Sequence, residues 1–426
     1  MSIVMVIGVL VLGLVFLFAW GFRHLPGERW QILAALPVEM QSDCAWRGVN
    51  LTYYGLFNAV ATGLGVALAV FLPGTVGLPL GYLMGCIVAF LAVVLPASKL
   101  INRLVEGDWH GFTVGGAAFV GMLAGPWLIL GVSRLVLPSA QAASAVPLML
   151  GVLMPAYALA EGVGRLACIS FGCCYGRPLA ACPGWLQKLF ASRAFIFEGR
   201  LKKAAYEHGL EKQPLIPVQA LTAVLSSFAG LTGVALFLSG RPIAAFILAV
   251  GVTQLWRFFS EFLRADYRGP GRISAYQWMA LAGAGYLVLL GLLWPDTPNP
   301  TPDVARGLAV LWTPAAVLFI EGVALVVFVR MGTSTVTESR IVMSLKREGM
   351  RASAKTPGNN FIELCVTRAA VESSQHGMKA HGLIGQAVVG CVPAAQRQKR
   401  REQGQQTDQE QAVQPAVSAL RAEEHS

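Results

Sequence analysis

The chain opens with a stretch that carries no formal charge, Ile3-Val-Met-Val-Ile-Gly-Val-Leu-Val-Leu-Gly-Leu-Val-Phe-Leu-Phe-Ala-Trp-Gly-Phe22. As an α-helix, a segment of about 20 residues rises about 30 Å, which is the thickness of the hydrocarbon core of a bilayer. No basic residue precedes this segment, and no small-residue cleavage site ends it. We therefore expect an uncleaved membrane anchor and not a signal peptide that is removed.

Similar apolar stretches recur along the chain. Hydrophobic residues make up 55% of it and charged residues only 13%, whereas a soluble domain has about a quarter of its residues charged. The sequence predicts an all-α fold, a polytopic membrane helix bundle of about nine transmembrane helices with a small extramembranous insertion. The further predicted spans cover residues 51–72, 78–98, 112–136, 146–160, 217–238, 243–259, 274–294 and 304–329.

Composition also divides the chain into regions. Residues 1–50 are predicted to form an extra N-terminal anchor and loop, and residues 51–294 the membrane core, in which residues 161–216 are a polar insertion. Residues 295–330 would add a further membrane helix. Residues 331–426 end in a Gln-, Arg- and Glu-rich run without aromatic residues, and we expect this tail to be largely disordered.

The net charge of +10 does not require a nucleic-acid partner, because the basic residues of the membrane region lie in loops, next to acidic lipid headgroups. Four of the eight cysteines are Cys168, Cys173, Cys174 and Cys182. They could supply four thiolates to zinc, but their spacing is not a paired Cys-x-x-Cys arrangement, and adjacent cysteines would form a strained chelate. We expect them to act as small packing residues, and we assign no metal and no cofactor.

Two clusters of ionisable residues lie near predicted membrane ends, where such groups are costly and therefore often functional. In the first, Arg257, Glu261 and Arg264 fall at i, i+4 and i+7, and we expect them on one face of a helix. Such a helix can present a guanidinium to a phosphate while the glutamate orients it. The alternative is interfacial snorkelling of the arginines with a helix salt bridge.

The second cluster begins with Glu161 and Arg165, again at i and i+4, and continues through Gly172-Cys-Cys-Tyr-Gly176 to Pro178. The glycines allow a tight turn out of the helix before the proline stops it. Gly164-Arg165, Gly172, an aromatic residue and Gly176 resemble the signature of prolipoprotein diacylglyceryl transferases in its Gly-Cys-Cys-Tyr-Gly variant.

Three further segments are similar to this family in the same order. They are Tyr53-Tyr54-Gly55-Leu56, Pro214-Leu-Ile-Pro217-Val-Gln219, and Arg257-Phe-Phe-Ser-Glu261-Phe-Leu-Arg264. The resemblance covers roughly residues 51–294. It implies transfer of the diacylglyceryl group of phosphatidylglycerol to the lipobox cysteine of a prolipoprotein, with release of glycerol 1-phosphate, in the bacterial inner membrane.

The resemblance also implies residue roles. Arg165 and Arg257 would hold the lipid phosphate, with Glu261 and Tyr54 as further catalytic residues. The remaining expected substrate contacts are Arg264, Gly115, Gly116, Gly176, Tyr175 and Gln219. Departures from the family pattern are Val114 in place of a histidine, and Cys168 and Cys173 in place of an asparagine and a glutamate.

These departures leave the base that deprotonates the substrate thiol open among Glu261, Tyr54, Tyr175, His110 and Cys173. A catalytically silent protein that binds lipid or a partner on the same scaffold is the alternative function. A transporter is disfavoured, because the sequence shows no internal repeat. The positive-inside rule places the basic signature loops in the cytoplasm, whereas the resemblance implies the outer face. We follow the resemblance.

Overall fold

A computed structural model describes residues 2–29, 31–40, 45–106, 114–199, 202–266, 273–293, 301–333, 339–346, 361–368 and 375–381. Within them the chain forms two compact units, one of Met1–Ala34 with Leu51–Thr337 and one of Ala35–Asn50 with Glu338–Ser426. The first unit is a bundle of long helices and the second contains most of a β-sheet.

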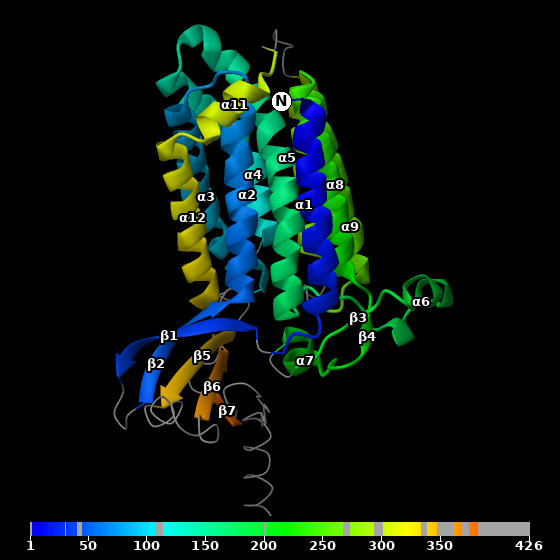
Figure 1. Cartoon of the computed structure of the whole chain (residues 1–426). Helices are drawn as coiled ribbons and strands as arrows, with labels where there is room; N and C mark the ends of the chain where they lie inside the picture. The colour runs from blue at the N-terminus through cyan, green and yellow to red at the C-terminus, as the bar shows by residue number, and fades with distance from the viewer. Residues whose placement is uncertain are drawn as a thin grey trace, which may run out of the picture. The chain divides into compact units, whose positions relative to one another are not determined.

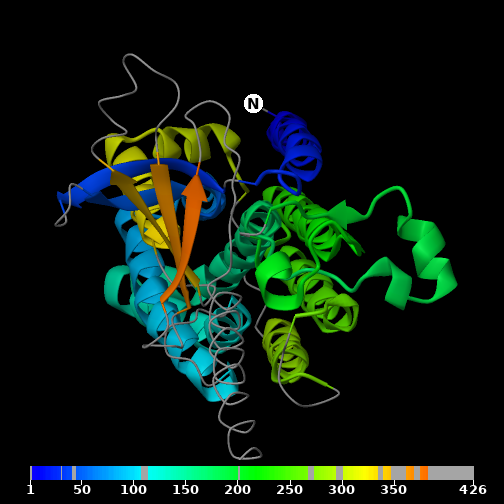
Figure 2. The ribbon, with the colours of Figure 1, turned by 90° about the horizontal axis from the view of Figure 1, so that it is seen from below.

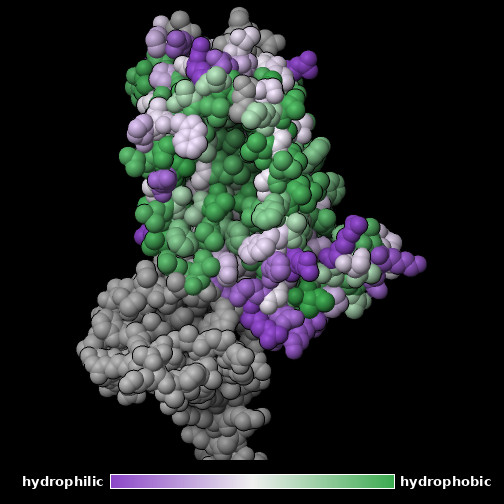
Figure 3. Space-filling model, in the orientation of Figure 1, coloured by the Kyte–Doolittle hydropathy of each residue, from purple (hydrophilic) through white to green (hydrophobic). Residues whose placement is uncertain are grey.

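Nine of the described helices are long and apolar enough to cross a membrane, which confirms the predicted helical class. On the face that Figure 3 shows, hydrophobic side chains cover most of the length of these helices. The helices are α1 (Ile3–His24), α2 (Tyr53–Thr75), α3 (Leu80–Glu106), α4 (Val114–Val136), α5 (Ser139–Phe171), α8 (Val218–Leu238), α9 (Pro242–Ser260), α10 (Ala275–Leu293) and α12 (Pro314–Thr333).

Helix α5 is the centre of the bundle and packs against α2, α4, α8 and α9 (Figures 1 and 2). Small residues allow this close packing: a Cβ atom added to Gly162 would lie 2.2 Å from the Ser227 hydroxyl oxygen of α8. The sequence placed the fifth span at residues 146–160, but the helix continues to Phe171. The charged residues at its end therefore lie inside a helix and not in the loop that follows.

The predicted last span is broken into two helices. Helix α11 (Val304–Leu311) begins where the Asp303 carboxylate accepts hydrogen bonds from the amides of Ala305 and Arg306. It ends at Trp312, and α12 begins at Pro314 (Figure 1). Proline suits the first turn of a helix, because its missing N–H needs no partner there.

The polar insertion follows α5 and contains short elements. These are the 3-10 turn η1 (Leu179–Ala181), α6 (Gly184–Phe190), β3 (Phe195–Ile196), α7 (Lys203–His208) and β4 (Pro214–Leu215). Strands β3 and β4 pair antiparallel, with Phe195 opposite Leu215. Fully buried Lys202 ties the insertion to the bundle, since its amine donates to the carbonyls of Leu25 (2.9 Å) and Ser170 (2.5 Å). Burial lowers the pKa of Lys202 to about 8.

The sheet was not foreseen from the sequence. Its strand order is β1-β2-β5-β6-β7, and β5, β6 and β7 form an antiparallel meander. The strands are β1 (Ile32–Met40), β2 (Ala45–Thr52), β5 (Ser339–Lys346), β6 (Phe361–Arg368) and β7 (Gln375–His381). Three of them lie in the tail that was expected to be largely disordered, whereas residues 396–426 fall outside the described part of the chain.

Candidate functional site

Two arginines from different helices share one carboxylate oxygen. Glu161 Oε1 accepts from Arg165 Nη2 at 2.5 Å on α5 and from Arg257 Nη2 at 2.7 Å on α9. Arg257 Nη2 also donates to the hydroxyl of Tyr157 at 2.6 Å. The structure therefore brings together the two arginines that the sequence analysis placed in the site.

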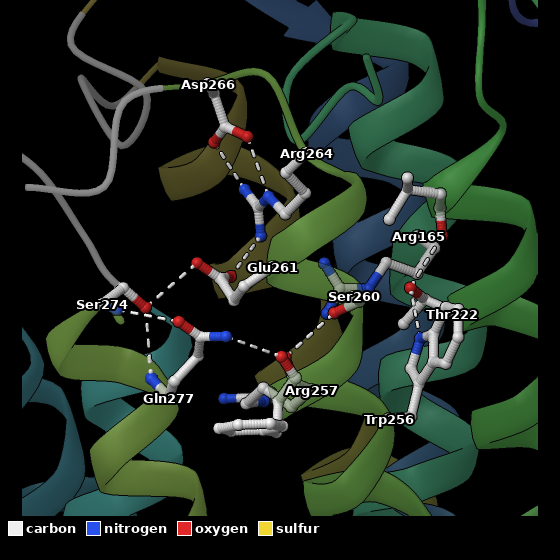
Figure 4. A network of polar contacts seen from close by, with 12 residues as sticks. Arg165, Thr222, Trp256, Arg257, Ser260, Glu261, Arg264, Asp266, Ser274 and Gln277 are labelled. Carbon is white, nitrogen blue, oxygen red and sulfur yellow. Dashed lines mark hydrogen bonds and ion pairs between the residues drawn. The ribbon is translucent and has the colours of Figure 1, made fainter. Parts of the chain in front are cut away.

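Helix geometry explains this meeting. Tyr157, Glu161 and Arg165 are spaced four residues apart on α5, so their side chains follow one face of that helix. Neighbouring helices hold the arrangement in place, because Ser226 of α8 lies 3.5 Å from the second oxygen of Glu161. The indole N–H of Trp256 donates to the Thr222 hydroxyl at 2.9 Å, which connects α9 to α8 beside the site (Figure 4).

The charges of this cluster do not cancel. Two permanently charged guanidinium groups face one carboxylate, which leaves one positive charge in excess. The arginine side chains remain 15% and 12% exposed, so a ligand can reach them. Within the described residues, buried Arg165 Nε has no hydrogen-bond partner. A buried donor without a partner is costly, and an anionic oxygen would satisfy it.

A second network lies just beyond α9. The Arg264 guanidinium donates to both oxygens of Asp266, with Nε–Oδ1 2.8 Å and Nη2–Oδ2 2.5 Å, and to Glu261 at 3.3 Å. The other oxygen of Glu261 accepts from the Ser274 hydroxyl at 3.3 Å. Figure 4 shows Arg264 between the two carboxylates.

This network corrects one prediction. Arg257, Glu261 and Arg264 do not form a helical stripe, because α9 ends at Ser260, Glu261–Leu263 is a 3-10 turn, and Arg264 is extended. In the described contacts Arg257 is oriented by Glu161 and Tyr157 and not by Glu261.

Backbone pairing explains why the helix stops. The loop after α5 runs beside the chain that leaves α9: the Arg177 amide donates to the Leu263 carbonyl at 2.9 Å, and the Ala265 amide to the Tyr175 carbonyl at 3.1 Å. Gly176 forms an isolated bridge with Arg264. A Cβ atom at Gly176 would lie 2.2 Å from the Ile216 carbonyl oxygen, so only glycine fits this crossing. Gly176 therefore joins the two signature segments.

Three cysteines converge at the end of α5. Gly172 ends the helix with a φ of +72°, and the Cys173 amide reaches back to the Cys168 carbonyl at 3.1 Å. This pattern is a Schellman motif, which brings the two cysteines together. Cys174 is also left-handed, with a φ of +55°, and the sulfur atoms of Cys168, Cys173 and Cys174 all lie within 4.8 Å of one another. Cys182 bonds to the Pro178 carbonyl instead.

Tyr54 and Gln219 lie beside this cysteine cluster. Tyr54, at the start of α2, contacts the Phe171 ring edge-to-face at 5.6 Å and lies within electrostatic range of the three cysteines. The Gln219 amide donates to the Cys173 carbonyl at 2.9 Å, and its own buried oxygen has no partner within the described residues.

The remaining predicted residues have other surroundings. The Tyr175 hydroxyl bonds to His208 and Glu207 of α7, so this ring holds the insertion in place. Gly115 packs against Tyr276 of α10, where a Cβ atom would lie 2.7 Å from the ring, and Gly116 is its buried neighbour. Their expected roles in substrate binding stay predictions. Val114 begins α4, and His110 falls outside the described residues.

Sequence reasoning missed Tyr157, Asp266 and Ser274 as members of these networks. Tyr157 could have been found, because it lies four residues before Glu161 on the face that carries Arg165. Asp266 and Ser274 meet Arg264 and Glu261 only because the chain turns after α9. Gly269-Pro270-Gly271 does indicate a turn, but the sequence does not show which side chains that turn brings together.

Comparison with known proteins shows which family the chain belongs to. The family profile described as Prolipoprotein diacylglyceryl transferase matches residues 44–294. The chain is similar to phosphatidylglycerol–prolipoprotein diacylglyceryl transferase 2 of Clostridium perfringens (strain 13 / Type A), with 25% identity over 196 residues. These residues are 43% of this chain and 59% of that relative, so the chain spans about three fifths of the relative's length. The chain therefore belongs to the prolipoprotein diacylglyceryl transferase family, a family of transferases, as a protein with multiple membrane-spanning helices.

Proposed function

We propose that this chain transfers the diacylglyceryl group of phosphatidylglycerol to the lipobox cysteine of prolipoproteins and releases glycerol 1-phosphate. The observation that carries the proposal is the cluster of Arg165, Arg257 and Glu161. Its single excess positive charge matches the single negative charge of a phosphodiester, and Arg165 Nε, which has no partner among the described residues, supplies a donor for it.

The reaction needs such a cluster at the phosphate. When the substrate sulfur attacks the glycerol carbon, the carbon–oxygen bond to phosphate breaks and negative charge grows on the leaving oxygen. Donors that are already fixed in a mostly buried site stabilise this charge without reorganising. Glu161 and Tyr157 fix Arg257 from the side of α5, and among the described contacts these two residues use Nη2 alone, which leaves Nη1 and Nε to face the lipid.

We place the protein in the bacterial inner membrane with the site at the outer face, where exported prolipoproteins arrive. The expected partners are phosphatidylglycerol, the lipobox segment of a prolipoprotein and the surrounding bilayer, and no nucleic acid. In support, α6 exposes Trp185 and Leu189 beside the site end of the bundle. Such amphipathic surfaces suit the membrane interface.

The alternative is a protein that binds lipid with this cluster but does not catalyse transfer. The replacements Val114, Cys168 and Cys173 favour it, because they remove side chains that the family pattern supplies for proton transfer. Both functions require lipid binding at the arginines, so only a test of turnover separates them.

Complementation provides this test. A bacterial strain depleted of its own transferase should grow and process lipoproteins when it expresses this chain, and the Arg165→Ala variant should fail at equal membrane abundance. If the wild-type chain inserts at that abundance and lipoproteins remain unmodified, the alternative function replaces the proposed one. The same strain that expresses an authentic transferase is the positive control.

A further inference from the structure

The mechanism above leaves one cluster of nucleophilic side chains unused. The sulfur atoms of Cys168, in the last turn of α5, and of Cys173 and Cys174, in the loop that follows, lie within 4.8 Å of one another. A zinc ion bound by thiolates has zinc–sulfur distances of about 2.3 Å, which places sulfur atoms about 3.8 Å apart in a tetrahedral site. The sulfur atoms therefore need to approach one another by no more than about 1 Å to reach that geometry.

The local backbone provides the chelate that the sequence made doubtful. The sequence spacing suggested four ligands that include a strained pair of adjacent cysteines. In the structure the sulfur atoms of three cysteines converge, and Cys182 bonds to the Pro178 carbonyl instead. The left-handed backbone of Cys174, with a φ of +55°, accommodates the strain of two adjacent cysteines that face one site. A residue other than glycine rarely adopts this conformation without a structural or functional cause.

We infer that Cys168, Cys173 and Cys174 form a zinc site with an open fourth position that takes the thiolate of the substrate cysteine. Three thiolates select a soft or borderline cation, and zinc with three protein ligands keeps a position for substrate. The substrate-thiol part of this inference rests on the proposed function, whereas the metal site does not.

The charges around the cluster suit this occupant. Zinc with three thiolates carries one net negative charge, and Cys174 lies within electrostatic range of both Arg264 and Arg165. Arg165 belongs to the cluster with one positive charge in excess. The metal site and the phosphate site are therefore neighbours with opposite net charges, and the arginines offset the negative charge of the zinc–thiolate group.

The site would also supply the missing proton transfer. Zinc binds thiolates, so the substrate thiol loses its proton to solvent on coordination, and no separate general base is needed. The bound sulfur then forms a bond to the glycerol carbon, while the carbon–oxygen bond to phosphate breaks and its electron pair leaves with the phosphate oxygen. Glycerol 1-phosphate departs and equilibrates with solvent protons. The product thioether is neutral and dissociates from zinc.

Metal content is measured first, on the full chain purified in detergent under reducing conditions. We expect one zinc ion per chain by elemental analysis and, after exchange with cobalt, a thiolate-to-cobalt charge-transfer band. Cys168→Ser, Cys173→Ser and Cys174→Ser should each lose most of the zinc, and Cys182→Ser, from the same loop, should keep it. Zinc-free wild-type protein, or zinc retained by all three variants, would overturn the site. The wild-type measurement does not depend on whether a variant folds.

The fourth position is tested without lipid, so that no transfer can occur. A lipobox peptide should shift the cobalt spectrum of the wild-type chain, and the same peptide with serine in place of cysteine should not. An unchanged spectrum overturns the substrate position. Transfer by zinc-free protein would remove the metal from the mechanism and leave the proposed function intact. If zinc binds and the peptide shifts the spectrum, but no transfer follows when phosphatidylglycerol is added, the metal site stands and the proposed function fails.

Discussion

The Arg257→Lys variant tests whether the site needs the several hydrogen-bond donors of a guanidinium or only a positive charge at this position. Arg257 uses Nη2 for both Tyr157 and Glu161, at 2.6 and 2.7 Å, and in the part of the chain that the structure describes no side-chain hydrogen bond is seen at its other nitrogens, which we expect to face the ligand. A lysine ammonium is a single point on a flexible chain and cannot keep these contacts while it meets a phosphate. Loss of one fixed donor to a developing anion costs about 3–4 kcal/mol, so we expect a rate about 10²–10³ lower.

The assay is the release of glycerol 1-phosphate from phosphatidylglycerol vesicles with a lipobox peptide, at matched amounts of purified protein. Arg241→Lys is the control, since Arg241 is exposed at the opposite end of the same helix. Its rate should match that of the wild-type chain. An Arg257→Lys rate within about threefold of wild type, less than 1 kcal/mol in barrier, would refute the role given to this guanidinium.

The other predictions concern stability. Glu161→Gln leaves two buried guanidinium groups without their carboxylate and should destabilise the chain by about 3–5 kcal/mol, and anionic phospholipid should restore thermal stability more in this variant than in the wild type. Gly176→Ala forces a Cβ atom against the Ile216 carbonyl oxygen and should lower the free energy of unfolding by about 1–3 kcal/mol. Gly184→Ala is the control and should have little effect, because open space surrounds Gly184. Equal melting temperatures of the two variants would contradict the close approach of Gly176 to Ile216. Burial holds the pKa of Lys202 at about 8, below its usual 10.5, so the folded state releases the proton first. The free energy of unfolding of the wild-type chain should therefore rise by about 3 kcal/mol between pH 8 and 10.5, relative to that of the Lys202→Met variant. If the free energies of the two proteins change in parallel with pH, this pKa shift is excluded.

Hydropathy was enough to predict the membrane spans, because length and absence of charge are properties of each segment alone. It failed where neighbouring helices decide the outcome. The fifth span looked short since Glu161 and Arg165 are charged, yet pairing inside the bundle keeps both in the helix to Phe171. The break at Pro314 was readable in principle, because proline restricts the residue before it.

Half of the site could be predicted and half could not. Arg165 and Arg257 were identified from motifs, but spacing paired Arg257 with Glu261, whereas its partner Glu161 lies 96 residues away in sequence. Contacts over such separations depend on how α5 and α9 pack, which periodicity does not encode. The cysteine cluster depends on the left-handed backbone at Gly172 and Cys174. The first is a position that glycine signals, and the second gives no sign in the sequence.

The most direct test of the central claim is mass spectrometry of a lipobox peptide after incubation with the purified chain and phosphatidylglycerol. We predict a peptide heavier by one diacylglyceryl group, attached to the cysteine as a thioether, with an equal amount of glycerol 1-phosphate. The peptide with serine in place of cysteine should remain unmodified. Unmodified cysteine peptide, under conditions in which an authentic transferase completes the reaction and this chain is folded and binds the lipid, would contradict the account.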